Sequence, residues 1–141
     1  MADSDGTGQV PASTYVQAMS CYKASLCYAL GGNSTSSPIA TNEIFPLNPK
    51  TGAIGSMAKI SGFDGTDISC ISASTCLISG FTGSGAAAKA AVVTVVNAKP
   101  GTPVNYPGSS LSFHSLACAS TSACYAVGSS SSGAIVDKVT S

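Results

Sequence analysis

The sequence contains no arginine and no tryptophan, and only 9% of its residues are charged. Six lysines balance six acidic residues, so the formal net charge is zero. Proteins that bind nucleic acid normally carry a surface rich in arginine and lysine. This composition therefore argues against a nucleic-acid partner.

Long hydrophobic runs are also missing. The longest apolar stretch, "AAVVTVVNA" at residues 90–98, is too short to span a bilayer. The chain does not open with a charged segment followed by an apolar one, so we expect any secretion signal to have been removed. We expect no membrane insertion.

The scarcity of charge does not indicate disorder, because 44% of the residues are hydrophobic and β-branched residues recur throughout. Serine and threonine hydroxyls must cover much of the surface instead. A length of 141 residues suits one domain or several small repeats that share a core. A neutral surface of this kind is typical of extracellular proteins.

One short phrase is written three times along the chain. Its copies read "AMSCYKASLCYALGGN" (18–33), "DISCISASTCLISGFT" (67–82) and "SLACASTSACYAVGSS" (115–130). Each copy contains two cysteines with five residues between them. The copies recur at intervals of 49 and 48 residues, which is a period typical of β-propeller blades and related repeat architectures.

The six cysteines allow 15 pairings in principle. Only pairing within each phrase gives every copy the same environment, and each phrase reads as a strand, a serine-rich turn and a second strand. We therefore predict three disulfides across hairpins, and the alternatives are zinc sites or free buried thiols. Structural zinc sites favour cysteines two to four residues apart. Disulfides would place the protein outside the cell, secreted or on the cell surface. The expected pairs are Cys21–Cys27, Cys70–Cys76 and Cys118–Cys124.

Further strand-like segments follow the first two phrases. They are residues 42–48 and 53–61, joined by a turn at 49–52, and residues 89–98 and 102–108, joined by a turn at 99–101. Each repeat therefore has about four strands, and helical periodicity is missing. We predict an all-β protein of three four-stranded antiparallel repeats of about 48 residues, at 19–67, 68–115 and 116–141.

The third repeat is shorter than the others, since only 13 residues follow Gly128. The residues ahead of the first phrase have nearly the missing length. We therefore expect residues 1–18 to supply a strand that closes the last repeat.

The second and third phrases resemble those of a known family. "ISCISASTCLISG" and "LACASTSACYAVG", followed by "GAIVDKV" (133–139), are similar to blades of secreted bacterial β-propellers. In that family a cysteine-bearing strand pair leads into an Ala-Val-Gly turn and an outer strand. Sialidase-type and photosystem-assembly-type propellers share the layout more distantly.

The resemblance implies that each repeat is a propeller blade. Propellers have four to eight blades, and three wedges cannot close a ring. Two chains would then combine into a six-bladed propeller, which makes the chain its own partner as a dimer or higher homo-oligomer. The alternatives are a β-trefoil closed within one chain and an edge-linked β polymer.

Few residues suggest chemistry. His114 is the only histidine, and no G-x-S-x-G nucleophile turn occurs, so we expect no enzyme activity. Asp64 and Asp67 fall in "GFDGTDIS", which favours a turn over a calcium site. We expect no metal and no cofactor.

The tyrosines divide into two groups. Tyr28 and Tyr125 occupy equivalent positions after the second cysteine, where the middle repeat has Leu77, and this favours a core position between blades. Tyr15, Tyr22 and Tyr106 lie outside that position and are, with His114, the candidate ligand contacts. The sequence thus predicts a secreted, non-enzymatic binding module that displays loops to a glycan or protein partner. The alternative is a structural subunit that self-assembles through open blade edges into a ring or an extracellular filament.

Overall fold

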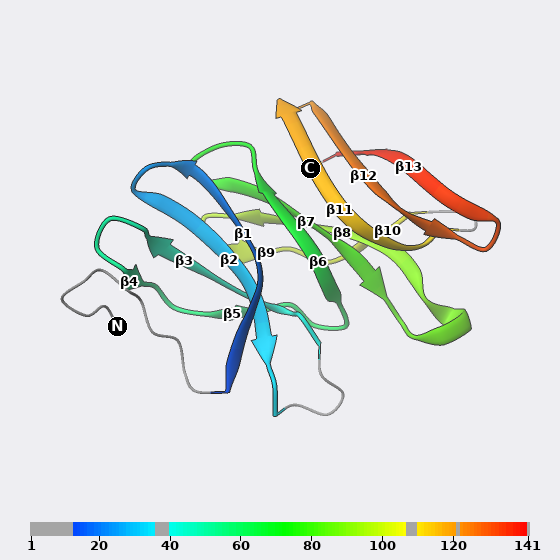
Figure 1. Ribbon diagram of the computed structural model, residues 1–141, viewed down its shortest axis with the longest axis horizontal. Helices are drawn as coiled ribbons and strands as arrows, with labels where there is room; N and C mark the ends of the chain where they lie inside the picture. Colours follow the sequence, from blue (N-terminus) through cyan, green and yellow to red (C-terminus); the bar gives the residue numbers. More distant parts are fainter. Residues whose placement is uncertain (1–12, 36–39, 107–109, 121, 141) are drawn as a thin grey trace.

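The computed structural model describes residues 13–35, 40–106, 110–120 and 122–140. These residues form three antiparallel β-sheets that follow one another along the chain, and Figure 1 shows the second sheet between the first and the third. The expected all-β architecture is therefore confirmed. The three sheets form an open stack and not a closed ring. Across the described ranges, the structure has no helix that is both long enough and apolar enough to cross a membrane.

Sheet 1 has five strands, in the order β1-β2-β3-β4, with β5 also paired to β3. The cysteine phrase supplies β1 and β2, and two short strands share the outer edge of β3. The strands are β1 (Thr14–Lys23), β2 (Leu26–Asn33), β3 (Glu43–Asn48), β4 (Ala53–Ile54) and β5 (Ala58–Lys59).

Sheet 2 repeats this layout. The second cysteine phrase supplies its first two strands, and two short strands again pair with the third. A short 3-10 helix, η1 (Gly85–Ala87), precedes the third strand. The strands are β6 (Asp64–Cys70), β7 (Thr75–Thr82), β8 (Lys89–Val96), β9 (Lys99–Pro100) and β10 (Val104–Asn105).

Sheet 3 has three strands, β11 (Ser110–Ser120), β12 (Ala123–Ser130) and β13 (Gly133–Val139). Among the described residues, nothing pairs with the outer edge of β13, where the other two sheets carry their short strands. Most of the closing strand expected at residues 1–18 lies outside the described residues. From Thr14 onward the chain belongs to β1 of sheet 1. The repeat boundaries expected at residues 68 and 116 fall inside β6 and β11.

Two local expectations are corrected. The turn after β8 lies at Asn97 and Ala98, where φ is 51° and 62°, and not at residues 99–101. A type I′ hairpin turn needs positive φ at both central positions, which asparagine adopts readily and the fixed φ of Pro100 forbids. Asp64 and Asp67 lie in strand β6 and not in a loop.

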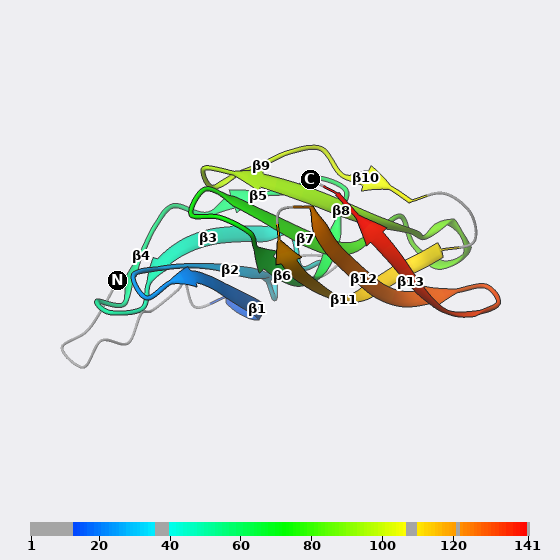
Figure 2. The ribbon, with the colours of Figure 1, turned by 90° about the horizontal axis from the view of Figure 1, so that it is seen from above.

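The sheets pack face to face and bury two apolar layers. Residues of sheets 1 and 2 form the first layer, which includes Tyr28, Leu30 and Ile78, and residues of sheets 2 and 3 form the second, which includes Leu77 and Phe113. The first strands of the three sheets, β1, β6 and β11, lie along one side of the stack, and the short outer strands lie along the other (Figure 2). The stack therefore has two ends, formed by sheet 1 and sheet 3.

Candidate functional site

All three cysteine phrases form disulfide-bonded hairpins. The bonds join Cys21 to Cys27, Cys70 to Cys76 and Cys118 to Cys124. In each hairpin the two cysteines are direct partners across the strand pair, which places both side chains on one face of the sheet. The three disulfides indicate an oxidising environment.

In sheets 2 and 3, the face that carries the cysteines, here called the cysteine face, points toward the preceding sheet. In sheet 2, Cys76 and Ile78 lie on this face and pack in the layer shared with sheet 1. In sheet 3, Cys124 and Ala126 lie on it and pack in the layer shared with sheet 2. The cysteine faces of sheets 2 and 3 are thus each covered by the opposite face of the preceding sheet.

The residue directly after the second cysteine of each phrase lies on the opposite face of the sheet, away from the cysteines. Tyr28 in sheet 1 is 5% exposed and Leu77 in sheet 2 is 0% exposed, because the next sheet covers each of them. Tyr125 occupies the same position in sheet 3 and is 49% exposed. The expectation of a core position between sheets therefore holds for the first two copies and not for the third.

The residue three positions after the second cysteine, and its partner on the next strand, are also buried in sheets 1 and 2. Leu30 faces Ile44 in sheet 1, and Ser79 faces Val92 in sheet 2, and all four side chains are buried.

The equivalent pair in sheet 3 is exposed. Val127 faces Val136 in the β12–β13 register, and these side chains are 42% and 68% exposed. Ala117, opposite Tyr125 on β11, is exposed as well. We call this apolar surface, made of Ala117, Tyr125, Val127 and Val136, the open face of sheet 3.

At the other end of the stack, sheet 1 exposes a position that is buried in sheets 2 and 3. Ile68 and Leu116, two residues before the first cysteine of their phrases, are buried on the cysteine faces of sheets 2 and 3. Met19 holds this position in sheet 1 and is 55% exposed. Val16, on the same face of β1, is 51% exposed. Met19 and Val16 form what we call the β1 patch.

The rest of the cysteine face of sheet 1 differs from the β1 patch. Cys27 and Ala29 on β2, and Phe45 on β3, are already buried within the single chain. The accessible apolar part of this face therefore runs along β1.

Polar side chains of one first strand bind the backbone of the next. The Ser20 hydroxyl on β1 accepts a hydrogen bond from the Cys70 N–H on β6, at 3.0 Å. The Asp67 carboxylate on β6 accepts hydrogen bonds from the Leu116 N–H at 2.9 Å and from the Ser115 hydroxyl at 3.2 Å, both on β11. These hydrogen bonds join β1 to β6 and β6 to β11, and so link neighbouring sheets through their first strands.

The four candidate ligand contacts do not form one site. The Tyr15 hydroxyl is 2.9 Å from the Thr41 hydroxyl; Thr41 is buried and Tyr15 is half-buried. Tyr106 packs edge-on against Phe113, with ring centroids 5.3 Å apart, and its hydroxyl accepts a hydrogen bond from the backbone N–H of Thr140.

Tyr22 is 50% exposed at the end of β1. His114 is exposed on β11, where its Nε2 atom is 3.2 Å from the Ser112 hydroxyl and 3.3 Å from the Ser129 hydroxyl. Among the described residues, no group of three or more His, Cys, Asp or Glu side chains is placed to hold a metal ion.

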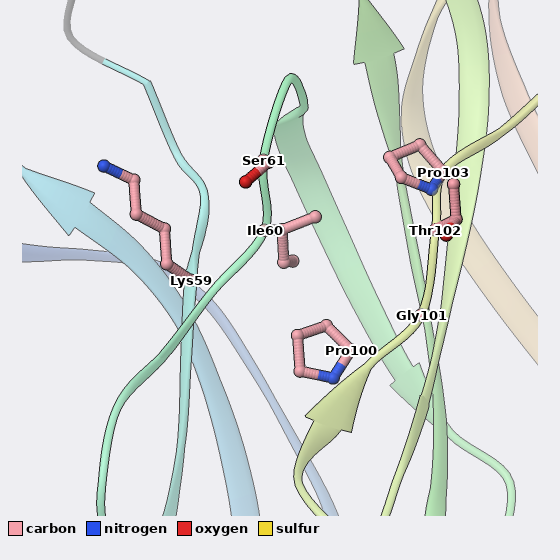
Figure 3. A pocket seen from close by; sticks show the side chains of 7 residues that line it. All are labelled: Lys59, Ile60, Ser61, Pro100, Gly101, Thr102 and Pro103. Atoms are coloured by element: carbon pink, nitrogen blue, oxygen red, sulfur yellow. The ribbon is translucent and has the colours of Figure 1, made fainter.

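A shallow depression lies between the outer parts of sheets 1 and 2 (Figure 3). Its volume is about 330 Å³, and its single charged side chain is Lys59. None of the four candidate ligand contacts lines it. The lining residues are Lys59, Ile60, Ser61, Pro100, Gly101, Thr102 and Pro103.

Sequence reasoning did not single out Met19, Val127 or Val136. A signal was present for Met19 and Val127, because the three phrases align without gaps and place each of them at a position that is buried in the other two sheets. Val136 lies outside the phrases, and its equivalence to Ile44 and Val92 follows from the strand register. Their exposure depends on what covers the sheet, which a single repeat does not encode.

Comparison with known proteins found no matching family model, no similar curated protein and no similar solved structure.

Proposed function

We propose that this chain is a non-enzymatic structural subunit that self-associates through the open face of sheet 3. The observation that carries the proposal is the exposure of Tyr125, Val127 and Val136 at positions that sheets 1 and 2 bury. A contiguous exposed apolar patch on a soluble protein marks an interaction surface. The three disulfides are consistent with a role outside the cell.

Self-association would also complete the architecture. Under this proposal the three sheets would form half of a six-bladed propeller, and a second chain would supply the other half. A closed ring would have twice the 13.8 kDa mass of one chain. If the rotation between chains does not close, the same contact builds a filament.

The test compares Val136→Glu with the wild type by light scattering across a dilution series. Val136 is 68% exposed in the single chain, so the substitution leaves the fold intact and places a charge in the contact. We expect the wild type to associate and Val136→Glu to associate about 100-fold more weakly, because the contact would have to remove the introduced carboxylate from water.

Val104→Glu is the matched control. Val104 is 63% exposed on β10, outside the open face, and the change in charge is the same. It should associate as the wild type does. A wild type that stays monomeric at every concentration, or a Val136→Glu variant that associates normally, would contradict the proposal.

The depression between sheets 1 and 2 favours a second candidate, a binding module for a small glycan or a peptide segment. Its volume falls at the lower end of the range of ligand pockets, and its lining combines prolines with hydroxyl groups. Calorimetric titration with oligosaccharides and peptides tests this candidate, and the absence of saturable heat would exclude the ligands tried.

A further inference from the structure

The stack ends in two different surfaces, and their repeat equivalence indicates how they pair. Within the chain, the face that carries Tyr28 or Leu77 always meets the cysteine face of the next sheet. The open face of sheet 3 is the third copy of that face. The surface that matches it is therefore a cysteine face that belongs to another sheet.

Among the three described sheets, only sheet 1 has a cysteine face against which no other described sheet packs. Cys27, Ala29 and Phe45 on that face are buried in the single chain, so the part that stays exposed is the β1 patch. It lies at the opposite end of the same stack, beyond the reach of sheet 3 of its own chain (Figure 1). The occupant of the open face is therefore a second copy of this chain. We infer that the chains associate head to tail, with the open face of sheet 3 on one chain packed against the β1 patch of the next.

The residues that meet can be assigned from the packing inside the chain. Ile68 shares a buried layer with Tyr28, and Leu116 shares one with Leu77. By the same relation, Met19 of one chain would pack near Tyr125 of the other. A methionine sulfur beside an aromatic ring is a favourable contact.

This arrangement differs from a symmetric contact in which two open faces pack against each other. A head-to-tail contact uses two different surfaces on each chain, so blocking either one prevents association. A contact between two open faces uses one surface twice, and it does not involve Met19. The inference rests on the proposed function, because it names the partner surface for the same open face.

The experiment blocks the two surfaces on separate chains. Met19→Glu blocks the β1 patch and Val136→Glu blocks the open face, and both side chains are more than half exposed in the single chain. Each variant alone should be monomeric at concentrations where the wild type is associated, a loss of about 100-fold in affinity. Circular dichroism and denaturant unfolding check that both variants fold as the wild type does.

Mixing the two variants gives the decisive measurement. The intact open face of Met19→Glu can bind the intact β1 patch of Val136→Glu. Native mass spectrometry, with one variant labelled with ¹⁵N, should therefore detect a one-to-one heterodimer that grows no further. Val104→Glu mixed with either variant serves as the control for charge.

The outcomes separate the two claims. If Met19→Glu associates by itself as strongly as the wild type, the head-to-tail arrangement is wrong, although the open face still drives association. If both variants are monomeric and their mixture is monomeric too, the β1 patch is not the partner surface. If Val136→Glu associates normally, the proposed function itself fails.

Discussion

At the scale of single residues, the contacts between sheets depend on a few polar side chains placed on the first strands. Asp67 is the clearest case. Its carboxylate accepts hydrogen bonds from Leu116 and Ser115, which lie 49 and 48 residues later in the chain. Its other oxygen accepts a hydrogen bond from the N–H of the adjacent Ile68. Asp67 therefore joins sheet 2 to sheet 3 and also orders its own strand.

We predict that Asp67→Ala lowers the free energy of unfolding by about 1–3 kcal/mol, since it leaves the Leu116 N–H without its acceptor. Ser115→Ala removes only the longer of the two contacts with β11 and should cost less. Denaturant unfolding of both variants measures the difference. Equal losses for the two variants would show that the Asp67–Leu116 hydrogen bond contributes little.

At the scale of elements, the disulfide-bonded hairpin is the repeated structural unit. In each hairpin one cysteine is fully or almost fully buried, namely Cys27, Cys76 or Cys124. The bond closes a loop with a sequence separation of 6 in all three copies. The cross-link therefore adds to the strand pairing and to the buried apolar layers that hold each hairpin in place.

Replacing both Cys118 and Cys124 by alanine should lower the free energy of unfolding by roughly 2 kcal/mol, the value expected for a loop of this length. Unfolding is measured by denaturant titration under non-reducing conditions. Full reduction of the wild type should cost more, because it opens three such loops. A double variant as stable as the oxidised wild type would show that the third disulfide contributes nothing to stability.

At the scale of the whole molecule, the open stack has ends that differ from its middle. The open face of sheet 3 is apolar, and Lys138 lies beside it, opposite Tyr125 in the strand register. The β1 patch consists of two apolar side chains. An interface between these surfaces would be held by burial of apolar area and not by charge.

The strength of self-association should therefore vary little with ionic strength. Between about 0.05 and 1 M NaCl we expect the dissociation constant to change by about twofold or less, because salt screens only exposed charges. Light scattering at several salt concentrations gives this value for the wild type. A tenfold weakening at high salt would indicate that lysine and acidic side chains hold the chains together.

Much of the local structure could be predicted from the sequence. The cysteine hairpins form between residues close in the chain, so their spacing was enough to place them. The β-branched run at residues 89–98 likewise predicted β8. The turn at Asn97 and Ala98 was misplaced by two residues, since proline and glycine at 100 and 101 give the stronger turn signal.

The sites at the ends of the stack could not be predicted in the same way. Tyr28 and Tyr125 have nearly identical local sequences, yet one is buried and the other is half exposed. The local sequence shows that a side chain is apolar. Whether that side chain is buried depends on whether a neighbouring sheet packs against it. The role of Asp67 was missed for a related reason, because its partners lie on a strand that is distant in sequence.

The sequence by itself determined three disulfide-bonded strand pairs, their repeat and their antiparallel sheets, because hairpins, turns and short loops are set by interactions between nearby residues. Only the tertiary structure decided which face of each sheet is buried. It also showed that an apolar face remains open at one end of the stack and an exposed patch at the other. Burial is a property of two surfaces in contact, and those surfaces come from repeats about 48 residues apart.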